Sequence, residues 1–344
     1  MTRHTRSFDP RILTRKCCDR LRSVGAYWVV SQRALCSPIY ELTAGWRGTE
    51  GNNRILRFEP ASSTHRVAFN PLDEIRLGTD HETGDMQNLA TLIVDPDGKG
   101  LHTHWQKTAC ALMTGCIAHV LYRQKKEKVP ATLPAVDDLL SDPDKTAHEV
   151  WTDMITYLHE NGATIPIVAK AARDQLNRPE EEAGSVLSTT LSYLTIYRDP
   201  VVANNVSRSD FHIRDLMHSE KPVTLYIVTE PVDKQRLQPL VRVLVNMIVR
   251  LSATGLSFEA GIPKPNFSHR LLLMLDESPL SENWIFFKNR SPFCQGTASK
   301  LISSRKTSTS STLTMGAMKQ SPRLATCNAR LHQTALKLLN TFPS

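Results

Sequence analysis

Five consecutive apolar residues, 271–275, lead directly into the acidic pair Asp276 and Glu277. An apolar run of this length, without polar alternation, is typical of a strand in a parallel sheet, because helices cover both faces of such a sheet. The carboxyl ends of parallel strands border the crevice in which α/β proteins bind ligands. The run therefore predicts a parallel strand that places two carboxylates at the ligand-binding edge of an α/β sheet.

The acidic pair has a catalytic and a structural interpretation. In a Walker B motif, the Asp after an apolar strand holds Mg²⁺, and the neighbouring Glu orients or deprotonates an attacking water. On this interpretation Asp276 is the metal- and cofactor-binding residue and Glu277 is the catalytic residue. The structural alternative is a buried strand that ends in a solvated turn, and the two residues alone do not separate the interpretations.

The basic excess of the chain lies at its two ends. The formal net charge of the 344 residues is +8, which by itself is typical of nucleic-acid-binding proteins. Residues 278–344 carry a net charge of +8, residues 1–39 carry +6, and the segment between them carries −6. The central segment is therefore mildly acidic, and the ends require a separate explanation.

Cysteine usage and hydropathy indicate the compartment. The 7 cysteines include no Cys-x-x-Cys pair, which argues against a disulfide framework or a zinc site and fits a reducing cytoplasm. The apolar runs are far shorter than the roughly 18 residues that a membrane helix requires, and no apolar signal-peptide core follows Met1. These features predict a cytoplasmic chain without a transmembrane segment and with about two domains.

The hydrophobic pattern changes along the chain from strands to helices and back. Strands are expected at 26–30, 55–58, 222–228 and 271–275, whereas residues 100–205 are nearly all helical. Between Trp105 and Leu121, for example, apolar residues follow alternating three- and four-residue steps. This order predicts an α/β sheet domain interrupted by an all-helical one. The helices are expected at 85–94, 105–121, 136–140, 147–160, 167–175, 180–193 and 237–251.

Three histidines, His81, His102 and His104, fall in or beside an expected loop. Such a group could hold a metal ion, but no carboxylate pattern accompanies it, so solvated side chains are the favoured interpretation.

Several segments, in unbroken order, resemble the TraG-like coupling proteins of type IV secretion, the TraG/TraD family of DNA-transfer ATPases. The resemblance covers residues 39–277 and is more specific than any single motif. The segments that carry it are 39–47, 56–60, 69–73 (Phe-Asn-Pro-Leu-Asp), Trp105 with its helix, 197–200 (Tyr-Arg-Asp-Pro), 207–211 (Ser-Arg-Ser-Asp-Phe), 225–231, 237–246 and 271–277.

The resemblance implies an α/β fold, a RecA-like P-loop ATPase core with a parallel sheet and helices on both faces. Residues 39–99 and 206–277 would form the two parts of this core, residues 100–205 an inserted all-α domain, and the ends would be irregular. It implies ATP and Mg²⁺ as cofactors, with Asp276 holding Mg²⁺ and Glu277 activating water. It also implies DNA, the relaxosome and secretion-channel components as partners, a homo-hexamer, and a place at the cytoplasmic face of the inner membrane.

The chain departs from the family pattern before the first matched segment. Family members carry membrane helices and a Walker A loop there, whereas residues 1–38 match neither. The only Gly-Lys-Gly, 98–100, lies after the matched segment 69–73 and lacks the preceding glycine and the following Ser/Thr of a phosphate loop. A solvated turn is the favoured interpretation of Lys99, and ATP binding by this chain is in doubt.

A second departure begins directly after Glu277. Residues 278–344 contain 19 Ser/Thr and one acidic residue, without periodicity, so a mostly disordered tail without a further sheet strand is expected. The family continues after the acidic pair with Phe-Pro-Ser-Leu-Gly. If one base is restored after codon 277, the codons for 278–294 allow that continuation, and later codons allow further family segments in order. We interpret the tail as an out-of-frame translation.

Three functional hypotheses remain open. The chain is a DNA-translocating coupling ATPase, or a non-catalytic remnant of that family without Walker A, or an unrelated DNA-binding protein that uses basic terminal arms. The missing phosphate loop favours the remnant for this chain as written. Salt-dependent DNA affinity that is lost on removing both ends would favour the third hypothesis.

Overall fold

The computed structural model describes residues 27–31, 53–275 and 300–303, except residues 65, 96–97, 160–161, 231, 253–256, 260–261, 265–266 and 270. All of these belong to the first of two compact units, Met1–Arg305. The acidic pair, residues 1–26 and most of the tail lie outside the described residues.

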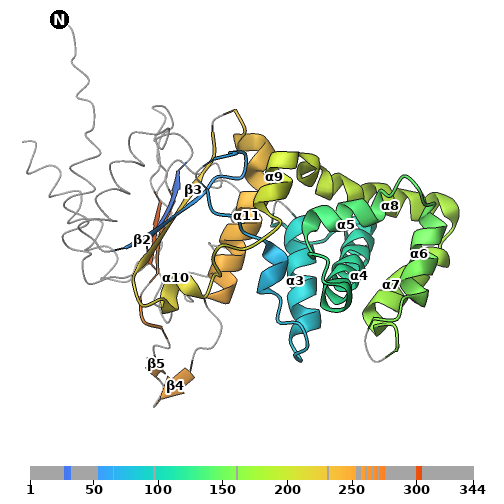
Figure 1. Cartoon of the computed structure of the whole chain (residues 1–344), viewed down its shortest axis with the longest axis horizontal. Helices are drawn as coiled ribbons and strands as arrows, with labels where there is room; N and C mark the ends of the chain where they lie inside the picture. The colour runs from blue at the N-terminus through green and yellow to red at the C-terminus, as the bar shows by residue number, and fades with distance from the viewer. Residues whose placement is uncertain are drawn as a thin grey trace, which may run out of the picture. The chain divides into compact units, whose positions relative to one another are not determined.

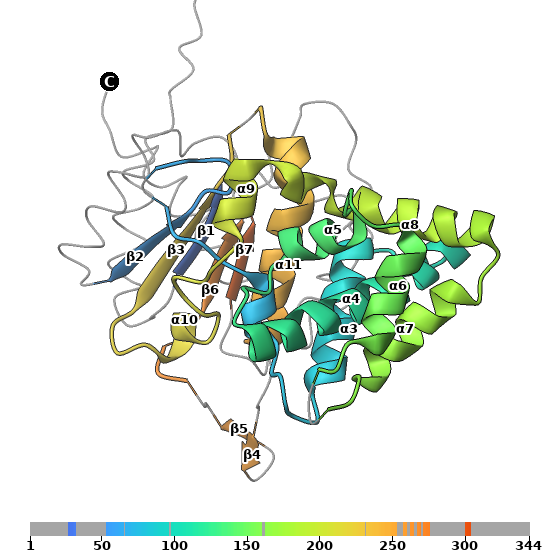
Figure 2. The same ribbon diagram turned by 45° about the vertical axis from the view of Figure 1, so that its right-hand side comes forward.

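Five parallel strands form one sheet (Figures 1 and 2). Their spatial order is β2 (Arg54–Phe58), β3 (Val223–Val228), β1 (Tyr27–Ser31), β6 (Leu272–Leu275) and β7 (Lys300–Ser303). All six residues of β3 are buried, as expected for an interior strand covered on both faces. The sequence predictions of strands at β1, β2, β3 and β6 are confirmed.

Strand β7 corrects one expectation. The tail was expected to add nothing to the sheet, yet Lys300–Ser303 pairs in parallel with β6 and aligns Leu301 with Leu273. Two adjacent apolar residues, Leu301 and Ile302, suit a short strand, and pairing satisfies the backbone groups of β6 that face away from β1. A separate antiparallel pair, β4 (Ser257–Glu259) and β5 (Ile262–Lys264), was not predicted.

Between β2 and β3, nearly all of the regular structure in the described residues is helical. The expected helices are present, although the one predicted to end at residue 160 ends at Thr156. The elements are the 3₁₀ helix η1 (Pro71–Glu74), α3 (Glu82–Val94), α4 (His104–Glu127), α5 (Leu133–Leu140), α6 (Ala147–Thr156), α7 (Pro166–Leu176), α8 (Glu180–Leu194), the 3₁₀ helix η2 (Thr195–Arg198) and α9 (Pro200–Asn205). After them come α10 (Asp215–His218) and α11 (Lys234–Leu251).

Side-chain caps fix where several of these helices begin. Thr103 caps α4 and Thr146 caps α6, each in a capping box completed by Gln106 and Glu149 respectively. Thr132 accepts the Ala135 N–H at the start of α5. These bonds satisfy backbone donors that the first helical turn leaves free. Within the part of the chain described here, no helix has the length and apolarity to cross a bilayer.

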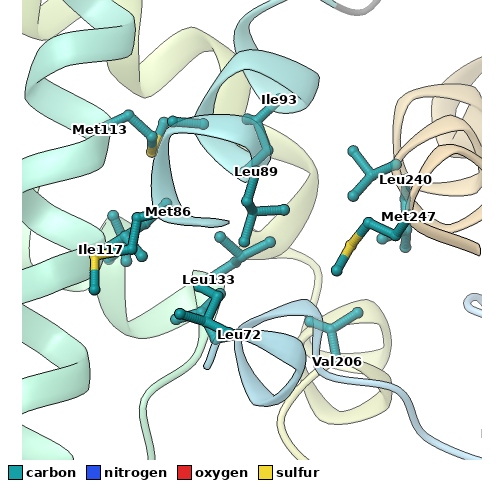
Figure 3. Close-up of a cluster of buried hydrophobic side chains, with 14 of the residues drawn as sticks. Leu72, Met86, Leu89, Ile93, Met113, Ile117, Leu133, Val206, Leu240 and Met247 are labelled. Carbon is teal, nitrogen blue, oxygen red and sulfur yellow. The ribbon is translucent and has the colours of Figure 1, made fainter. Parts of the chain in front are cut away.

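The buried core runs from the sheet through α11 into the helical segment. Helix α11 lies between the sheet and α3 in both views (Figures 1 and 2), and it packs against α3. Figure 3 shows Leu240 and Met247 of α11 on the side that faces Leu89 of α3, with Met113 of α4 beyond α3. One continuous apolar core therefore joins the sheet to the helices.

Candidate functional site

The carboxyl ends of the parallel strands meet at one edge of the sheet, where the sequence places Asp276 and Glu277. The register aligns Leu275 of β6 with Val30 of β1. The acidic pair directly follows Leu275 but lies outside the described residues. The roles of these carboxylates in Mg²⁺ binding and water activation therefore stay predictions, and the described residues show what else surrounds this edge.

A buried amide holds the turn after β2. Asn205, the last residue of α9, is 1% exposed, and its Oδ1 accepts a bond from Arg66 Nε. Its Nδ2 lies 3.3, 2.7 and 3.0 Å from three backbone oxygens, those of Glu59, Pro60 and Ser62. Because buried carbonyl groups require partners, one side chain from the end of the helical segment fixes the carboxyl end of a strand.

Arg236 links the same edge to the helical segment. It lies in the first turn of α11, and its Nη1 donates to Asp199 Oδ2 at 2.6 Å. Its Nε and Nη2 donate to Asp233 Oδ1 at 3.0 and 2.7 Å. The hydrogen bond from Arg236 holds the pKa of Asp199 below its ordinary value. Asp199 also caps α9 through the Val201 N–H at 2.9 Å, so one carboxylate joins two helix starts.

The chain passes between the sheet and the helices twice, and the two passages are hydrogen-bonded together. The Phe69 N–H donates to the Asn205 carbonyl at 2.9 Å. The Ala68 N–H donates to Asp210 Oδ2 at 2.7 Å, and the Asp210 N–H donates back to the Ala68 carbonyl at 3.0 Å. The segments that leave and re-enter the sheet region are therefore held at a fixed separation.

Asn70 is the centre of this junction and is 2% exposed. Its Oδ1 accepts the Leu72 N–H at 3.2 Å, and its Nδ2 donates to Asp73 Oδ1 at 3.0 Å and to the Ala131 carbonyl at 2.8 Å. The Ser209 hydroxyl donates to Asp73 Oδ2 at 2.7 Å. The side chain thus caps η1 and ties it to the loop before α5.

Buried groups reinforce the junction on both sides of Asn70. Phe69 stacks on Phe211 with ring centroids 5.2 Å apart. Glu74 accepts the Ile213 N–H at 2.9 Å and contacts the His212 ring nitrogen at 3.3 Å. Burial raises the pKa of Glu74, and the bond from Ile213 opposes that rise.

A bidentate ion pair fixes the end of the helical segment to α5. Arg198 Nε and Nη2 lie 2.9 and 3.0 Å from the two oxygens of Asp137, a buried carboxylate. This fork geometry is the strongest form of a carboxylate hydrogen bond, and Asp137 raises the pKa of Arg198.

The comparisons with known proteins identify the family. A family profile described as type IV secretory system conjugative DNA transfer matches residues 36–281. The chain belongs to this family. It is 61% identical over 241 residues to the conjugal transfer protein TraG of Escherichia coli, with 70% of this chain and 38% of the relative covered. It is 24% identical over 254 residues to VirD4 of Rhizobium radiobacter, with 70% of this chain and 32% of the relative covered.

The chain spans about two fifths of the length of the TraG relatives, 38% and 40% of two of them. Among solved structures, the bacterial conjugative coupling protein TrwB, described in complex with sulphate, aligns with a TM-score of 0.47 and 15% identity. That alignment covers 83% of this chain and 63% of the TrwB chain. A TrwB structure described in complex with ADP and Mg²⁺ aligns with a TM-score of 0.46.

Within this family member, segments that carried the sequence resemblance lie together at the junction. The segments 69–73 and 207–211 share hydrogen bonds through Asn70, Asp73 and Ser209. In the segment 197–200, Arg198 bonds to α5 and Asp199 bonds to α11. These residues position the helical segment on the sheet, and none of them is placed here as a reactive group.

The Gly-Lys-Gly turn at 98–100 is closed by a carboxylate rather than open to a phosphate. Gly98 and Gly100 have positive φ values of 67° and 96°. The Lys99 and Gly100 N–H groups donate to the two Asp95 oxygens at 3.1 and 2.7 Å. A phosphate cradle needs such N–H groups free, so this turn does not fit that role.

The side chains of two of the three histidines considered as a metal group have partners of their own. His102 Nε2 lies 2.6 Å from the Lys99 carbonyl, His104 Nε2 lies 3.1 Å from Glu182 Oε1, and His81 is the N-cap residue of α3. Among the described residues, no group of three or more His, Cys, Asp or Glu could hold a metal ion.

Sequence reasoning missed the structural roles of Asn205 and Arg236. Their partners lie 146 and 37 residues away in the sequence, so no local pattern marks them. The sequence analysis did single out one partner of each. The matched segment 56–60 contains Glu59, a partner of Asn205, and the segment 197–200 contains Asp199, a partner of Arg236.

Proposed function

We propose that the chain is part of a type IV secretion coupling protein, a DNA-translocating ATPase, and that as written it is a non-catalytic remnant. The observation that carries the proposal is the unbroken order of family segments from residue 39 to the acidic pair, without a Walker A sequence anywhere in the 344 residues.

The strand arrangement supports a RecA-like core interrupted by a helical insertion. Parallel strands lie on either side of the helical segment in the sequence, and β6 leads into the proposed Walker B pair. We assign residues 39–99 and 206–277 to the core and 100–205 to the insertion. Asn205 and Asp210 lie beside the second boundary, whereas Asn70 lies before α3 and therefore well ahead of the first.

The described residues offer no cradle for the phosphates of ATP. The one glycine-rich turn with a lysine has two of its N–H groups bonded to Asp95. Asp276 and Glu277 have the carboxylate chemistry that Mg²⁺ and water activation require, but binding a nucleotide also requires contacts to its phosphates. The carboxylates would therefore be retained without the group on which they act.

In the whole protein, the partners would be DNA, the relaxosome and secretion-channel components, with a homo-hexamer at the cytoplasmic face of the inner membrane. These follow from family membership. In this chain, the family profile matches residues 36–281.

A nucleotide assay tests the proposal. The purified full chain and its Asp276→Asn variant are titrated with ATP and Mg²⁺, and phosphate release is measured with and without DNA. We expect neither chain to bind or hydrolyse ATP, while a P-loop ATPase of known activity reports in the same assay. Mg²⁺-dependent hydrolysis by the parent chain that Asp276→Asn abolishes would show a working ATPase.

The out-of-frame tail has its own test. Its Ser/Thr load, its single acid and the end of the family match at residue 281 support a lost base after codon 277. Sequencing the source DNA decides the matter, because a frame that no single-base change can restore to the family continuation would refute it. The hypothesis of an unrelated DNA-binding protein with basic arms finds no support in the comparisons.

A further inference from the structure

The helical segment contains a pocket to which the function proposed above assigns no role. It has a volume of about 520 Å³ and lies between α4, α5, α6 and the loop that joins α5 to α6. Apolar and charged side chains share its wall. The charged ones are Arg123, Glu127, Asp138, Asp142, Lys145 and Asp153.

Ion pairing within the wall leaves a negative excess. Arg123 pairs with Glu127 at 3.0 Å, and Lys145 pairs with Asp153 at 2.7 Å. Within the described part of the chain, Asp138 forms no side-chain hydrogen bond or ion pair. The two cations of the wall are thus neutralised by two of its four acids.

The remaining acids, Asp138 and Asp142, lie at the carboxyl end of α5, and Asp142 also interacts electrostatically with Lys145. Asp138 lies in the last turn of α5, and Asp142 follows the C-cap residue Ser141. Asp142 accepts one bond, from the Asp144 N–H at 3.0 Å. The negative end of a helix dipole repels carboxylates, and two carboxylates near each other repel. A cation between Asp138 and Asp142 would relieve both effects.

A buried histidine supplies a donor to the pocket. His119 lines the pocket and is 4% exposed. The Ile165 N–H donates to His159 Nδ1 at 3.4 Å, so the His159 proton is on Nε2, which lies 2.8 Å from His119 Nδ1. His119 Nδ1 is therefore an acceptor, and its own proton is on Nε2. This N–H has no acceptor among the described residues.

We propose that the pocket binds an alkyl cation, the guanidinium or ammonium of an arginine- or lysine-like group. Asp138 and Asp142 receive the charged head, and the apolar wall of Ala135, Leu139 and Val150 receives the aliphatic stem. The His119 N–H donates to a carbonyl oxygen of the same ligand. A residue of a peptide carries both the cation and the carbonyl, whereas a free polyamine carries only the cation.

Calorimetric titration of the full chain tests the site with three probes. N-acetyl-arginine amide has the cation and the carbonyl groups, N-acetyl-citrulline amide is its neutral analogue, and spermidine has cations alone. We expect the arginine probe to bind, the citrulline probe not to bind, and spermidine to bind more weakly. Equal binding of the arginine and citrulline probes, or no binding of either cationic probe, overturns the proposal. Tighter binding of spermidine overturns the carbonyl contact and assigns the site to a free polyamine.

Matched variants locate the binding. The double change Asp138→Asn and Asp142→Asn is expected to weaken the arginine probe by about tenfold or more. Glu181→Gln removes an exposed acid of α8 outside the pocket and is expected to change nothing. Undiminished binding by the double variant refutes the site. Thermal melting of each variant checks that it is folded. If the double variant has a lowered melting temperature, Asp138→Asn alone replaces it, with an expected weakening of about threefold. The test needs no nucleotide, so its result is independent of the coupling function.

Discussion

Single buried polar residues hold together segments that are distant in the sequence. Asn70 and Asn205 bond to backbone groups across the junction, and Asp137 bonds to Arg198. His119 and His159 form a neutral pair beneath the pocket. Each group lies where a polar atom would be costly without its partner, so the loss of one partner should be measurable.

The histidine pair makes the free energy of unfolding depend on pH in the acidic range. Burial lowers the pKa of His119 to about 3 and that of His159 to about 4, both below the ordinary 6.5. As pH falls below 6.5, the unfolded chain binds protons that the folded chain does not. Stability is therefore lost from pH 6.5 down to about 4 for His159 and about 3 for His119. We expect the free energy of unfolding, measured by urea titration, to fall by about 1–3 kcal/mol between pH 7 and pH 5.

Two glutamine variants isolate this effect from other titrations. His119→Gln is expected to reduce the acid dependence to the part due to His159, whose pKa burial lowers on its own, whereas His148→Gln, at an exposed position of α6, leaves it unchanged. An acid dependence in His119→Gln equal to that of the parent chain would rule out the pair as its source.

Asn205→Ala should destabilise the folded chain without touching the hydrophobic core. The change removes the Asn205 donor from the carbonyl groups of Pro60 and Ser62, and the Glu59 carbonyl keeps only the Ser62 N–H, at a cost of about 2–3 kcal/mol. Asn204→Ala changes the exposed neighbouring residue and should stay within about 0.5 kcal/mol. Urea titrations of both variants measure the difference, and similar midpoints would contradict the role given to Asn205.

At the scale of elements, the close crossing of α4 and α7 depends on a glycine. A Cβ at Gly115 would stand 2.3 Å from the Ala171 Cβ and 3.6 Å from the Ile167 carbonyl oxygen. The missing side chain therefore lets two helix backbones approach each other, an arrangement that larger residues prevent.

Gly115→Ala is expected to destabilise the chain by about 1–3 kcal/mol, although alanine is the better helix former. Gly184→Ala, in α8 with open space around it, should instead stabilise by about 0.5–1 kcal/mol. Thermal melting measures both. Adding Ala171→Gly to Gly115→Ala should recover part of the loss, and a Gly115→Ala variant as stable as Gly184→Ala would contradict the crowding.

Long periodic elements were predictable and short ones were not. The apolar runs of β3 and β6 and the periodic face of α4 each determine an element within one window of sequence. Helices α9 and α10, with 6 and 4 residues, are too short to show a period. Strand β7 forms by pairing with β6, and no periodic pattern in residues 278–344 predicts this pairing.

The acidic pair could be predicted from the sequence because its signal is local, and its role stays a prediction. The junction was not, because Asn70 and Asn205 act on groups that only the fold brings near. The pocket was not predicted for the same reason, because its wall combines residues of α4 with residues as far along the chain as Tyr157.

At the scale of the whole molecule, the continuous core predicts that the sheet and the helices unfold together. Leu240→Ala in α11 removes a fully buried side chain at the α3 contact (Figure 3) and should cost about 2–5 kcal/mol. Amide hydrogen exchange should then accelerate in both β3 and α4, because they share that core. Val232→Ala, at a side chain 90% exposed, is the control. Faster exchange confined to α11 and β3 would show separate folding units.

The paired passages at residues 68–70 and 205–210 also bear on how such a protein can diversify. Because the chain leaves the sheet region and returns at adjoining points, everything between them is a closed excursion whose length does not alter the alignment of the strands. Relatives could exchange or enlarge this excursion while keeping the sheet, provided that they keep the residues that fasten its two ends and those that cover α11. This geometry permits a chimera in which the corresponding segment of the VirD4 relative replaces the excursion between these points. The surface of the new segment that takes the place of α3 would have to match α11.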